Sequence, residues 1–299
     1  MGTPEFAVES LKCLVEGGYN VVGVVTMPDK PMGRHQDVLQ ASPVKQYAVE
    51  HGLRVLQPVK LKDEAFVEEL RSLRADLQIV VAFRMLPEVV WNMPPMGTFN
   101  LHASLLPQYR GAAPINWAIL NGEAVTGVTI MHMAPALDAG DIIAQVSTPI
   151  GADETAPTLT ARLAELGAEL LVSAVEAIGA GTAARTPQDE ADSTYAPMLS
   201  RELSPMDWSK PARTLHDQVR GLLPWPAAVA EFGGIRCKVF STDLPIQTTD
   251  AAPGTILEAG KRGIDIACGG GTVLHIDELQ ADGGKRMKAA DYLRGHPLN

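Results

Sequence analysis

The sequence predicts an α/β domain with a mostly parallel sheet, followed by a small β-barrel domain. In the first 180 residues, short apolar runs alternate with amphipathic stretches, which is typical of strands and helices in βαβ units. From about residue 183 the chain becomes polar and carries prolines without a clear period, as expected of a linker. In the last third, five short strand-like runs are separated by Gly-rich turns, which favours a small barrel.

The elements of the first domain follow in order along the chain. Apolar runs at 19–26 and 77–83 predict buried strands, and residues 96–104 predict a strand that runs into a loop. Residues 42–52 predict a helix, because Ser42 suits an N-cap, Pro43 the first helical position and Gly52 the end. Residues 125–133 and 141–150 predict an antiparallel pair, and residues 156–181 predict a long helix.

The second domain follows the linker. We predict a first domain at 1–182, a linker at 183–203 and a C-terminal barrel domain at 204–299. A helix is expected at 210–222, ended by Pro224-Trp225-Pro226. The barrel strands are expected in the segments AAVAEF, IRCKVFS, GTILEA, GIDIA and TVLHIDEL.

Charge narrows the class of partner. The chain has 299 residues and a net charge of −10, which argues against a generally basic nucleic-acid binder. The acidity lies in residues 1–199, which hold 13 Lys/Arg and 23 Asp/Glu, whereas residues 200–299 hold 12 of each. A neutral C-terminal third can still present a local basic face to a polyanion.

Several features predict a cytoplasmic protein. No apolar run is long enough to cross a membrane, and the N-terminal MGTPEFAVES lacks the basic and apolar regions of a secretory signal. The three cysteines, Cys13, Cys237 and Cys268, are far apart and form no Cys-x-x-Cys pair. This spacing suggests neither a zinc site nor a disulfide framework, so we expect reduced thiols.

The segment 99–141 carries the candidate chemistry. Strand residues alternate faces, so Asn100 and His102 project to the same side near the carboxyl end of a strand, where ligands bind in open α/β sheets. An amide donor beside a histidine suits a reaction that passes through an oxyanion. An isolated Asn-x-His pair is more often incidental, but here a long Gly/Pro-punctuated loop follows it. Further on, Asp138 and Asp141 flank a glycine, which fits a catalytic carboxylate or an ordinary Asx turn.

At this point the chain resembles the folate-dependent formyltransferases, and most of all the members that act on methionyl-tRNA. The superfamily resemblance lies in the runs FNLHASLLP (99–107), YRGAAPI (109–115) and Leu137-Asp138-x-Gly140-Asp141. The resemblance to the tRNA-directed members lies in Thr194-Tyr195-Ala196-Pro197, Asp207-Trp208, Pro224-Trp225-Pro226, Ala252-Pro253-Gly254-Thr255-Ile256 and Lys285-Arg286-Met287. The resemblance implies a Rossmann-like formyltransferase domain and an OB-like C-terminal domain.

The resemblance also implies site residues and substrates. Asn100, His102 and Asp138 would form the catalytic set, and Ser104, Leu105, Leu106 and Pro107 would contact the folate. In the resembling family the loop that holds Arg34 reaches toward the tRNA, so Arg34 would bind it. Lys285 and Arg286 are expected to bind the tRNA on a different ground: with Lys261-Arg262 they are basic pairs in turns of the barrel, which fits a phosphate-facing patch or an ordinary solvated surface. The expected reaction moves the formyl group of 10-formyltetrahydrofolate to the α-amine of methionyl-initiator tRNA, for translation initiation. No residue cluster has metal-ligand spacing, so no metal is expected. We expect a monomer.

Two alternatives stay open at this stage. The same chemistry could serve another amine, such as an amino-sugar nucleotide or glycinamide ribonucleotide. Alternatively, the protein could bind folate or tRNA without turnover.

The first strand of the sheet is incomplete in this sequence. The resembling family carries a short apolar strand before the Gly-Thr-Pro loop, and here only Met1 precedes Gly2-Thr3-Pro4. Such a strand is central and buried on both faces. The five apolar residues missing from it would contribute roughly 8–15 kcal/mol of burial. We therefore expect either a chain start upstream of Met1 or a destabilised fold.

Overall fold

The computed structural model describes residues 1–32 and 38–298, and the chain divides into two compact units. The first unit comprises Met1–Gly111, Thr126–Thr148 and Thr160–Tyr195, and the second comprises Ala112–Val125, Pro149–Leu159 and Ala196–Asn299. The final division falls after Tyr195, inside the segment predicted as a linker, and two earlier segments also belong to the second unit.

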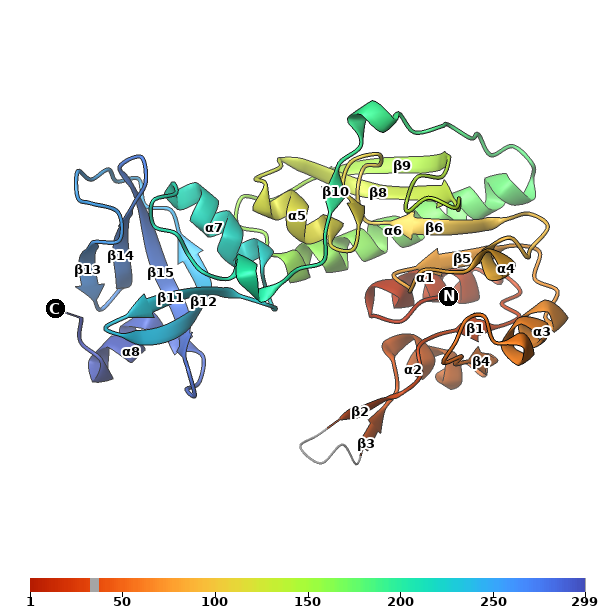
Figure 1. Cartoon of the computed structure of the whole chain (residues 1–299), viewed down its shortest axis with the longest axis horizontal. Coiled ribbons are helices and arrows are strands. Elements are labelled where there is room, and N and C mark those ends of the chain that lie inside the picture. Colours follow the sequence, from red (N-terminus) through yellow and green to blue (C-terminus); the bar gives the residue numbers. More distant parts are fainter. Residues whose placement is uncertain (33–37, 299) are drawn as a thin grey trace. The chain divides into compact units, whose positions relative to one another are not determined.

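The first unit is built on a mixed sheet (Figure 1). A four-stranded sheet has the order β5 (Gln78–Val81), β6 (Thr98–His102), β8 (Val125–His132) and β9 (Ile142–Pro149), and a parallel pair joins β1 (Val24–Val25) to β4 (Val55–Leu56). Strands β5 and β6 are parallel, whereas β6 and β8 are antiparallel. Strands β2 (Lys30–Met32) and β3 (Val38–Gln40) form a separate antiparallel hairpin.

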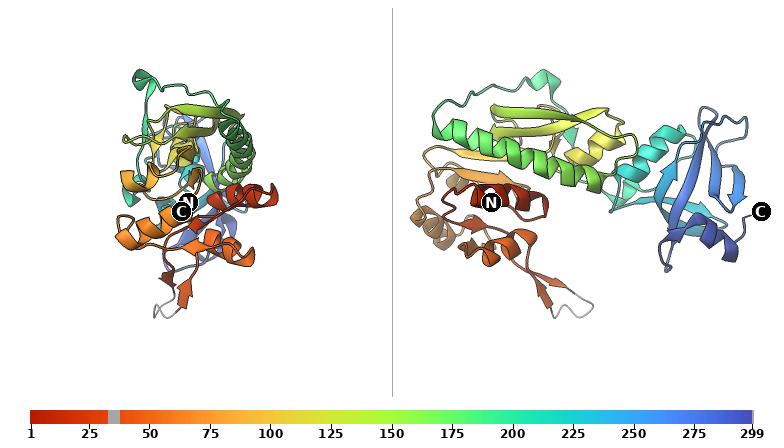
Figure 2. Two further views of the ribbon diagram at one scale, coloured as in Figure 1. Left: turned by 90° about the vertical axis from the view of Figure 1, so that its right-hand side faces the viewer. Right: turned by 180° about the vertical axis from the view of Figure 1, so that it is seen from behind.

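Helices cover both faces of this sheet. Helices α1 (Phe6–Glu16) and α6 (Ala156–Gly179) cover one face (Figure 2). On the other face, side chains of α3 (Glu64–Ser72) and α4 (Glu88–Trp91) form one apolar core with Val25, Leu56 and Val80. Helix α6 approaches closely at Gly167, where a Cβ would lie 2.8 Å from Leu101 Cδ2. This close packing places α6 directly against β6, the strand that carries Asn100 and His102.

Local signals position the short helices as predicted. Helix α2 (Pro43–Glu50) begins after Ser42, whose Oγ accepts a hydrogen bond from the Lys45 backbone N–H at 3.1 Å. The strands predicted at 77–83, 96–104, 125–133 and 141–150 are formed by β5, β6, β8 and β9. The long helix predicted at 156–181 is also confirmed, as α6.

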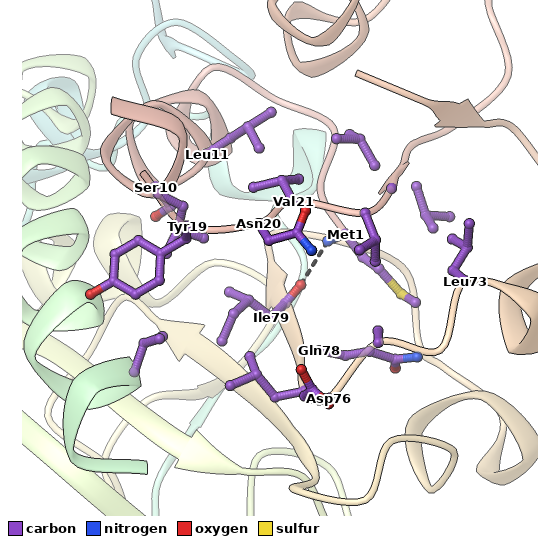
Figure 3. Close-up of a pocket in the computed structure, with 18 of the residues that line it drawn as sticks. Met1, Ser10, Leu11, Tyr19, Asn20, Val21, Leu73, Asp76, Gln78 and Ile79 are labelled. Atoms are coloured by element: carbon purple, nitrogen blue, oxygen red, sulfur yellow. Dashed lines mark hydrogen bonds between the residues drawn. The ribbon is translucent and has the colours of Figure 1, made fainter. Parts of the chain in front are cut away.

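An apolar cavity of about 510 Å³ lies between β1 and β5. Figure 3 shows the Met1 ammonium inside it, donating to the Ile79 carbonyl at 2.6 Å. Gly2 N–H donates to Val25 O at 3.0 Å, and Val81 N–H donates to Met1 O at 2.9 Å. Met1 and Gly2 therefore bridge the two strands over two residues, and the cavity continues from there between residues 21–23 and 77–79. Burial lowers the pKa of the Met1 amino group to about 5.

The prediction of a strand over residues 19–26 was wrong in its extent. Only Val24 and Val25 form a strand, paired with Val55 and Leu56. The preceding residues 19–23 line the cavity instead. A buried apolar run becomes a strand only where a neighbour offers backbone partners. Gly2 offers one to Val25, whereas residues 21–23 face the cavity.

The second unit is an antiparallel-strand domain, as predicted. Its main path runs β11 (Ala228–Phe232), β12 (Ile235–Asp243), β15 (Thr272–Ala281), β14 (Gly263–Cys268) and β13 (Ile256–Gly260), and β16 (Met287–Lys288) pairs with β15. These strands match the five predicted runs. Among the described residues, β11 and β13 are not paired with each other, so the sheet curves around its core without closing its ladder.

Helices complete the second unit. Helix α7 (Ala212–Gly221), predicted at 210–222, packs Leu215 against Cys268 and Leu274 of the sheet. Helix α8 (Ala289–Gly295) contributes Tyr292 and Leu293 to the sheet's main core, and α5 (Pro114–Leu120) packs against α7. The three cysteines are free thiols. Within 1–32 and 38–298, no helix is both long and apolar enough to span a membrane.

Candidate active site

Strand β6 delivers Asn100 and His102 to one end of the sheet. Phe99 and Leu101 alternate with them and are 1% and 2% exposed, so apolar burial sets the register of the strand. Asn100 pairs with Val80 of β5 and Met131 of β8, and His102 pairs with Thr129. The strand ends at His102, so both side chains lie at its carboxyl end, as predicted.

The Asn100 side chain is available for a ligand. Asn100 is only partly buried, and its amide makes no hydrogen bond to any residue in the described parts of the chain. A primary amide supplies two N–H donors and stays neutral at all ordinary pH values. Asn100 can therefore donate to a negatively charged oxygen without first breaking an internal contact.

The imidazole of His102 is held by the backbone. His102 Nε2 lies 2.9 Å from the Tyr109 carbonyl oxygen, and the side chain is 7% exposed. A carbonyl oxygen only accepts, so Nε2 carries the hydrogen and donates. Nδ1 is the nitrogen left to exchange a proton, and it lies 3.7 Å from Asp138 Oδ2.

Asp138 lies on a tight turn after β8. Its φ of +49° is in the left-handed region, where a non-glycine residue is uncommon. Its Oδ2 accepts a hydrogen bond from the Gly111 backbone N–H at 2.8 Å. Gly140 lets this turn pass close to β8, because a Cβ there would lie 1.6 Å from the His132 carbonyl. The structure therefore brings Asn100, His102 and Asp138 to the same end of the first unit.

The segment 104–107, predicted to contact folate, is anchored by its polar atoms. Ser104 is fully buried and donates to the Gln108 carbonyl, and Leu106 is 3% exposed. The Thr129 hydroxyl donates to Ser104 O at 2.6 Å and accepts from Leu106 N–H at 3.2 Å. Leu105 and Pro107 keep partly exposed side chains and are the members that can touch a ligand directly.

The residues predicted to bind tRNA differ in their surroundings. Arg34 lies outside the described residues. Lys285 is exposed, with no acidic partner in the described parts of the chain. Arg286 donates to Glu278 through Nε at 2.9 Å and stacks over the Phe240 ring at 4.7 Å. This arginine holds the pKa of the Glu278 carboxyl below its usual value, so its own charge is largely compensated.

Sequence reasoning missed the residues that support this site. Gln188 donates to the Asp138 carbonyl and accepts from Arg110, and Thr194 accepts from the Tyr109 backbone N–H. Gln188 lies in a polar, aperiodic stretch, and no local pattern marks it as different from any linker residue. Thr194 and Arg110 were recognised only as parts of family-like motifs.

The described residues form no group of three or more His, Cys, Asp or Glu side chains that could hold a metal ion. What the cluster does offer is an amide donor, an imidazole and a carboxylate at the end of one sheet. Such a set can stabilise an oxyanion and move a proton.

Comparison with known proteins matches both parts of the chain. Residues 1–175 match the family model described as "Formyl transferase", and residues 198–297 match "Formyl transferase, C-terminal domain".

The similar proteins include two methionyl-tRNA formyltransferases. The one from Phocaeicola vulgatus is 53% identical and the one from Parabacteroides distasonis 52%; each alignment covers 99% of this chain and 94% of the relative. A solved N-formyltransferase from Helicobacter canadensis, in complex with folinic acid and dTDP-3-aminofucose, is 21% identical with a TM-score of 0.68. That alignment covers 92% of this chain and 96% of the other, and it shows the fold alone.

Proposed function

The chain belongs to the formyltransferase family, and from this membership we propose that it transfers the formyl group of 10-formyltetrahydrofolate to the α-amine of methionyl-initiator tRNA. The observation that carries the proposal is the identity of 52–53% to methionyl-tRNA formyltransferases over 99% of the chain. The match includes the C-terminal unit, where an enzyme acting on a small amine would have no need of the same residues. The product would serve translation initiation, and we propose a cytoplasmic, monomeric enzyme.

The geometry supports acyl transfer to an amine. The neutral amine attacks the formyl carbon, a C–N bond forms, and the formyl oxygen becomes negative in the tetrahedral intermediate. The unengaged Asn100 amide would donate to that oxygen, and His102 would be the second donor when protonated. The bond to the folate nitrogen then breaks, and the electron pair returns to the carbonyl.

Proton movements complete the reaction. The attacking amine loses one proton, and the departing folate nitrogen gains one. Asp138 would accept the first proton directly or through water, because its carboxylate lies beside His102 Nδ1, the ring nitrogen that is not bonded to the Tyr109 carbonyl. His102 Nδ1 or water would return a proton to the folate nitrogen, while Nε2 stays bound to the Tyr109 carbonyl.

The folate is proposed to lie against Leu105 and Pro107. Both side chains are partly exposed, and the hydrogen bonds of Ser104 and Thr129 hold the backbone between them. The tRNA is proposed to contact Arg34, Lys285 and Arg286. Nothing in the proposed reaction requires a metal.

An assay with labelled 10-formyltetrahydrofolate and charged initiator tRNA tests this proposal. We expect formyl-methionyl-tRNA from the wild-type protein and almost none from His102→Ala or Asp138→Ala, with folate binding largely retained in both variants. Unchanged turnover in either variant would refute the assigned roles. Transfer only to an amino-sugar nucleotide or to glycinamide ribonucleotide would replace the acceptor, and folate or tRNA binding without any transfer would overturn the proposal.

A further inference from the structure

The segment between α6 and β10 (Tyr195–Ala196) lies against the candidate active site. We call residues 186–194 of this segment the strap. At its start, Thr186 pairs with Ile142 at the beginning of β9, with N–H···O distances of 2.8 and 2.9 Å in the two directions. At its end, Thr194 N–H donates to Pro107 O and Arg110 N–H donates to Thr194 O. The strap therefore joins the loop before β9 to the loop after β6.

The side chain of Gln188 lies at the centre of the strap and uses its full hydrogen-bonding capacity. Its Nε2 donates to the carbonyl oxygens of Asp138 and Gly140, both at 2.8 Å. Its Oε1 accepts from Arg110 Nε at 3.1 Å and from Arg110 Nη2 at 2.8 Å. An amide has two donor hydrogens and an acceptor oxygen, so all of its polar sites are engaged.

These contacts hold Asp138 in an unfavourable backbone conformation. Asp138 has a φ of +49°, which costs free energy for a residue with a Cβ. The two carbonyl bonds from Gln188 lie on either side of Ala139 and keep the turn in this conformation. In this conformation the Asp138 carboxylate points toward the Gly111 N–H and His102 Nδ1.

The same strap also supports the other partner of His102. The Thr194 hydroxyl accepts from the Tyr109 backbone N–H at 2.8 Å, and Tyr109 has a φ of +59°. The Tyr109 carbonyl in turn accepts from His102 Nε2. Hydrogen bonds from the strap therefore fix both groups beside the imidazole, the Tyr109 carbonyl and the Asp138 carboxylate.

We propose that Gln188 is a positioning residue for the formyl transfer, which acts by holding the turn that carries the Asp138 carboxylate beside His102. The inference rests on the proposed function for its kinetic readout. Gln188 touches neither substrate in the proposed reaction. Its effect on the rate passes through Asp138.

The test variant is Gln188→Glu. Glutamate keeps the size of the side chain and the contacts of Oε1 with Arg110, but it replaces the two N–H donors with an acceptor that faces two carbonyls. We expect kcat to fall by about 100-fold, because small misplacements of catalytic groups have effects of this size, while the KM values for folate and tRNA change by less than about threefold. The matched control is Glu190→Gln: Glu190 also contacts Arg110, but it is 71% exposed, and kcat should stay within about twofold.

A double-mutant cycle separates positioning from a general structural role. In an Asp138→Asn background, adding Gln188→Glu should lower the residual rate by less than about threefold, because the group that it positions is already altered. An equal drop in both backgrounds, or a drop confined to KM, would overturn the proposal. If the added charge prevents folding, Gln188→Met removes the donors without a charge and is expected to show the same pattern.

Hydrogen exchange at Gly111 provides a readout that needs no activity. The Gly111 N–H donates to Asp138 Oδ2, so its exchange should accelerate in Gln188→Glu and stay unchanged in Glu190→Gln. A wild-type protein without formyl transfer would refute the proposed function alone, and the exchange result would still decide the role of Gln188. Unchanged Gly111 exchange in Gln188→Glu would refute the positioning role.

Discussion

At the level of single residues, the candidate site contains one side chain without an internal hydrogen bond in the described chain and two side chains that are fixed by hydrogen bonds to the backbone. Asn100 has no internal partner in the described chain, whereas His102 and Asp138 are each bonded to backbone groups. Such a division is expected of a site for an oxyanion: the ligand replaces no internal bond at Asn100, and the proton-transfer pair keeps its orientation without the ligand.

Asn100→Ala tests the role of the free amide. We expect kcat to fall about 100- to 1000-fold, since that is the usual loss when one oxyanion donor is removed. The KM for formyl-folate should change little, because the donor acts mainly on the charged intermediate. Steady-state kinetics of tRNA formylation measures both values. Asn92→Ala, at the exposed end of α4, is the control and should retain full activity; an equal loss in both variants would contradict the assignment.

At the level of helices and strands, two features of the fold affect stability, a buried ion pair that favours the folded state and a cavity that weakens it. One is helix α7, where Arg220 and Asp217 form an ion pair whose side chains are both 5% exposed. Arg220 also donates to the carbonyls of Gly151 and Glu154, at 3.3 and 2.9 Å. The helix is thereby joined to a chain segment far away in the sequence but in the same compact unit.

Arg220→Leu should destabilise the second unit by about 3 kcal/mol, because removing one member of a buried pair leaves the other charge without its partner. The value is expected at the low end of the usual range, since Arg213 Nε remains 3.5 Å from the Asp217 carboxylate. Urea unfolding followed by circular dichroism measures the difference. Arg236→Leu breaks an exposed Arg–Asp pair of the same unit and should cost less than about 1 kcal/mol. Similar costs for the two variants would show that burial of the pair does not matter here.

The second feature is the cavity between β1 and β5. An apolar extension of five β-forming residues placed before Met1 should fill it and pair with the exposed backbone of the neighbouring strands. Burial of these residues contributes about 1.5–3 kcal/mol each, which exceeds the backbone ordering cost of about 1–2 kcal/mol each. We expect Tm to rise by about 5 °C or more.

The matched control for this extension is a Gly/Ser segment of the same length, which has no apolar side chains to bury. It should leave Tm unchanged or lower. Equal melting temperatures for the two extended proteins, measured by scanning calorimetry, would mean that the cavity does not accept a strand.

At the level of the whole molecule, the sign of the net charge is the opposite of what binding to a polyanion such as tRNA favours. The protein carries a net charge of −10, yet the matched relatives are named for a tRNA substrate. Residues 200–299 are neutral overall, so a polyanion that binds to them meets less repulsion than at the acidic residues 1–199. Within this segment, Lys285 is exposed without an acidic partner in the described chain, whereas Arg286 is paired with Glu278.

Lys285→Ala should weaken tRNA binding and lower the slope of log K against log salt by about 1, as expected for the loss of one phosphate contact. Arg286→Ala should have a smaller effect, because its charge is already compensated by Glu278. Dissociation constants measured at several salt concentrations give both slopes, and folate binding should be unchanged. A larger slope change for Arg286→Ala than for Lys285→Ala would show that the ion pair opens when tRNA binds.

Several properties could be predicted from the amino-acid order alone: the alternation of strands and helices in the first domain, the antiparallel C-terminal domain, the family, and the residues expected to carry the chemistry. These properties depend on local periodicity, caps and contiguous motifs, which can be seen within a short window of residues. Asn100 and His102 share one strand, so their placement together followed from alternation alone.

How the site is held depends on contacts between distant parts of the chain. The bond of His102 to the Tyr109 carbonyl, and the turn that places Asp138 beside Nδ1, join residues from separate loops. Gln188 reaches that turn across about 50 positions of sequence, from a segment with no periodicity to mark it. At 19–26 the sequence predicted too much structure. The apolar pattern there indicates a full strand, but the fold provides strand partners for only two of the residues. Hydrogen bonds between distant segments depend on which backbone groups meet in space, and no short window of sequence contains that information.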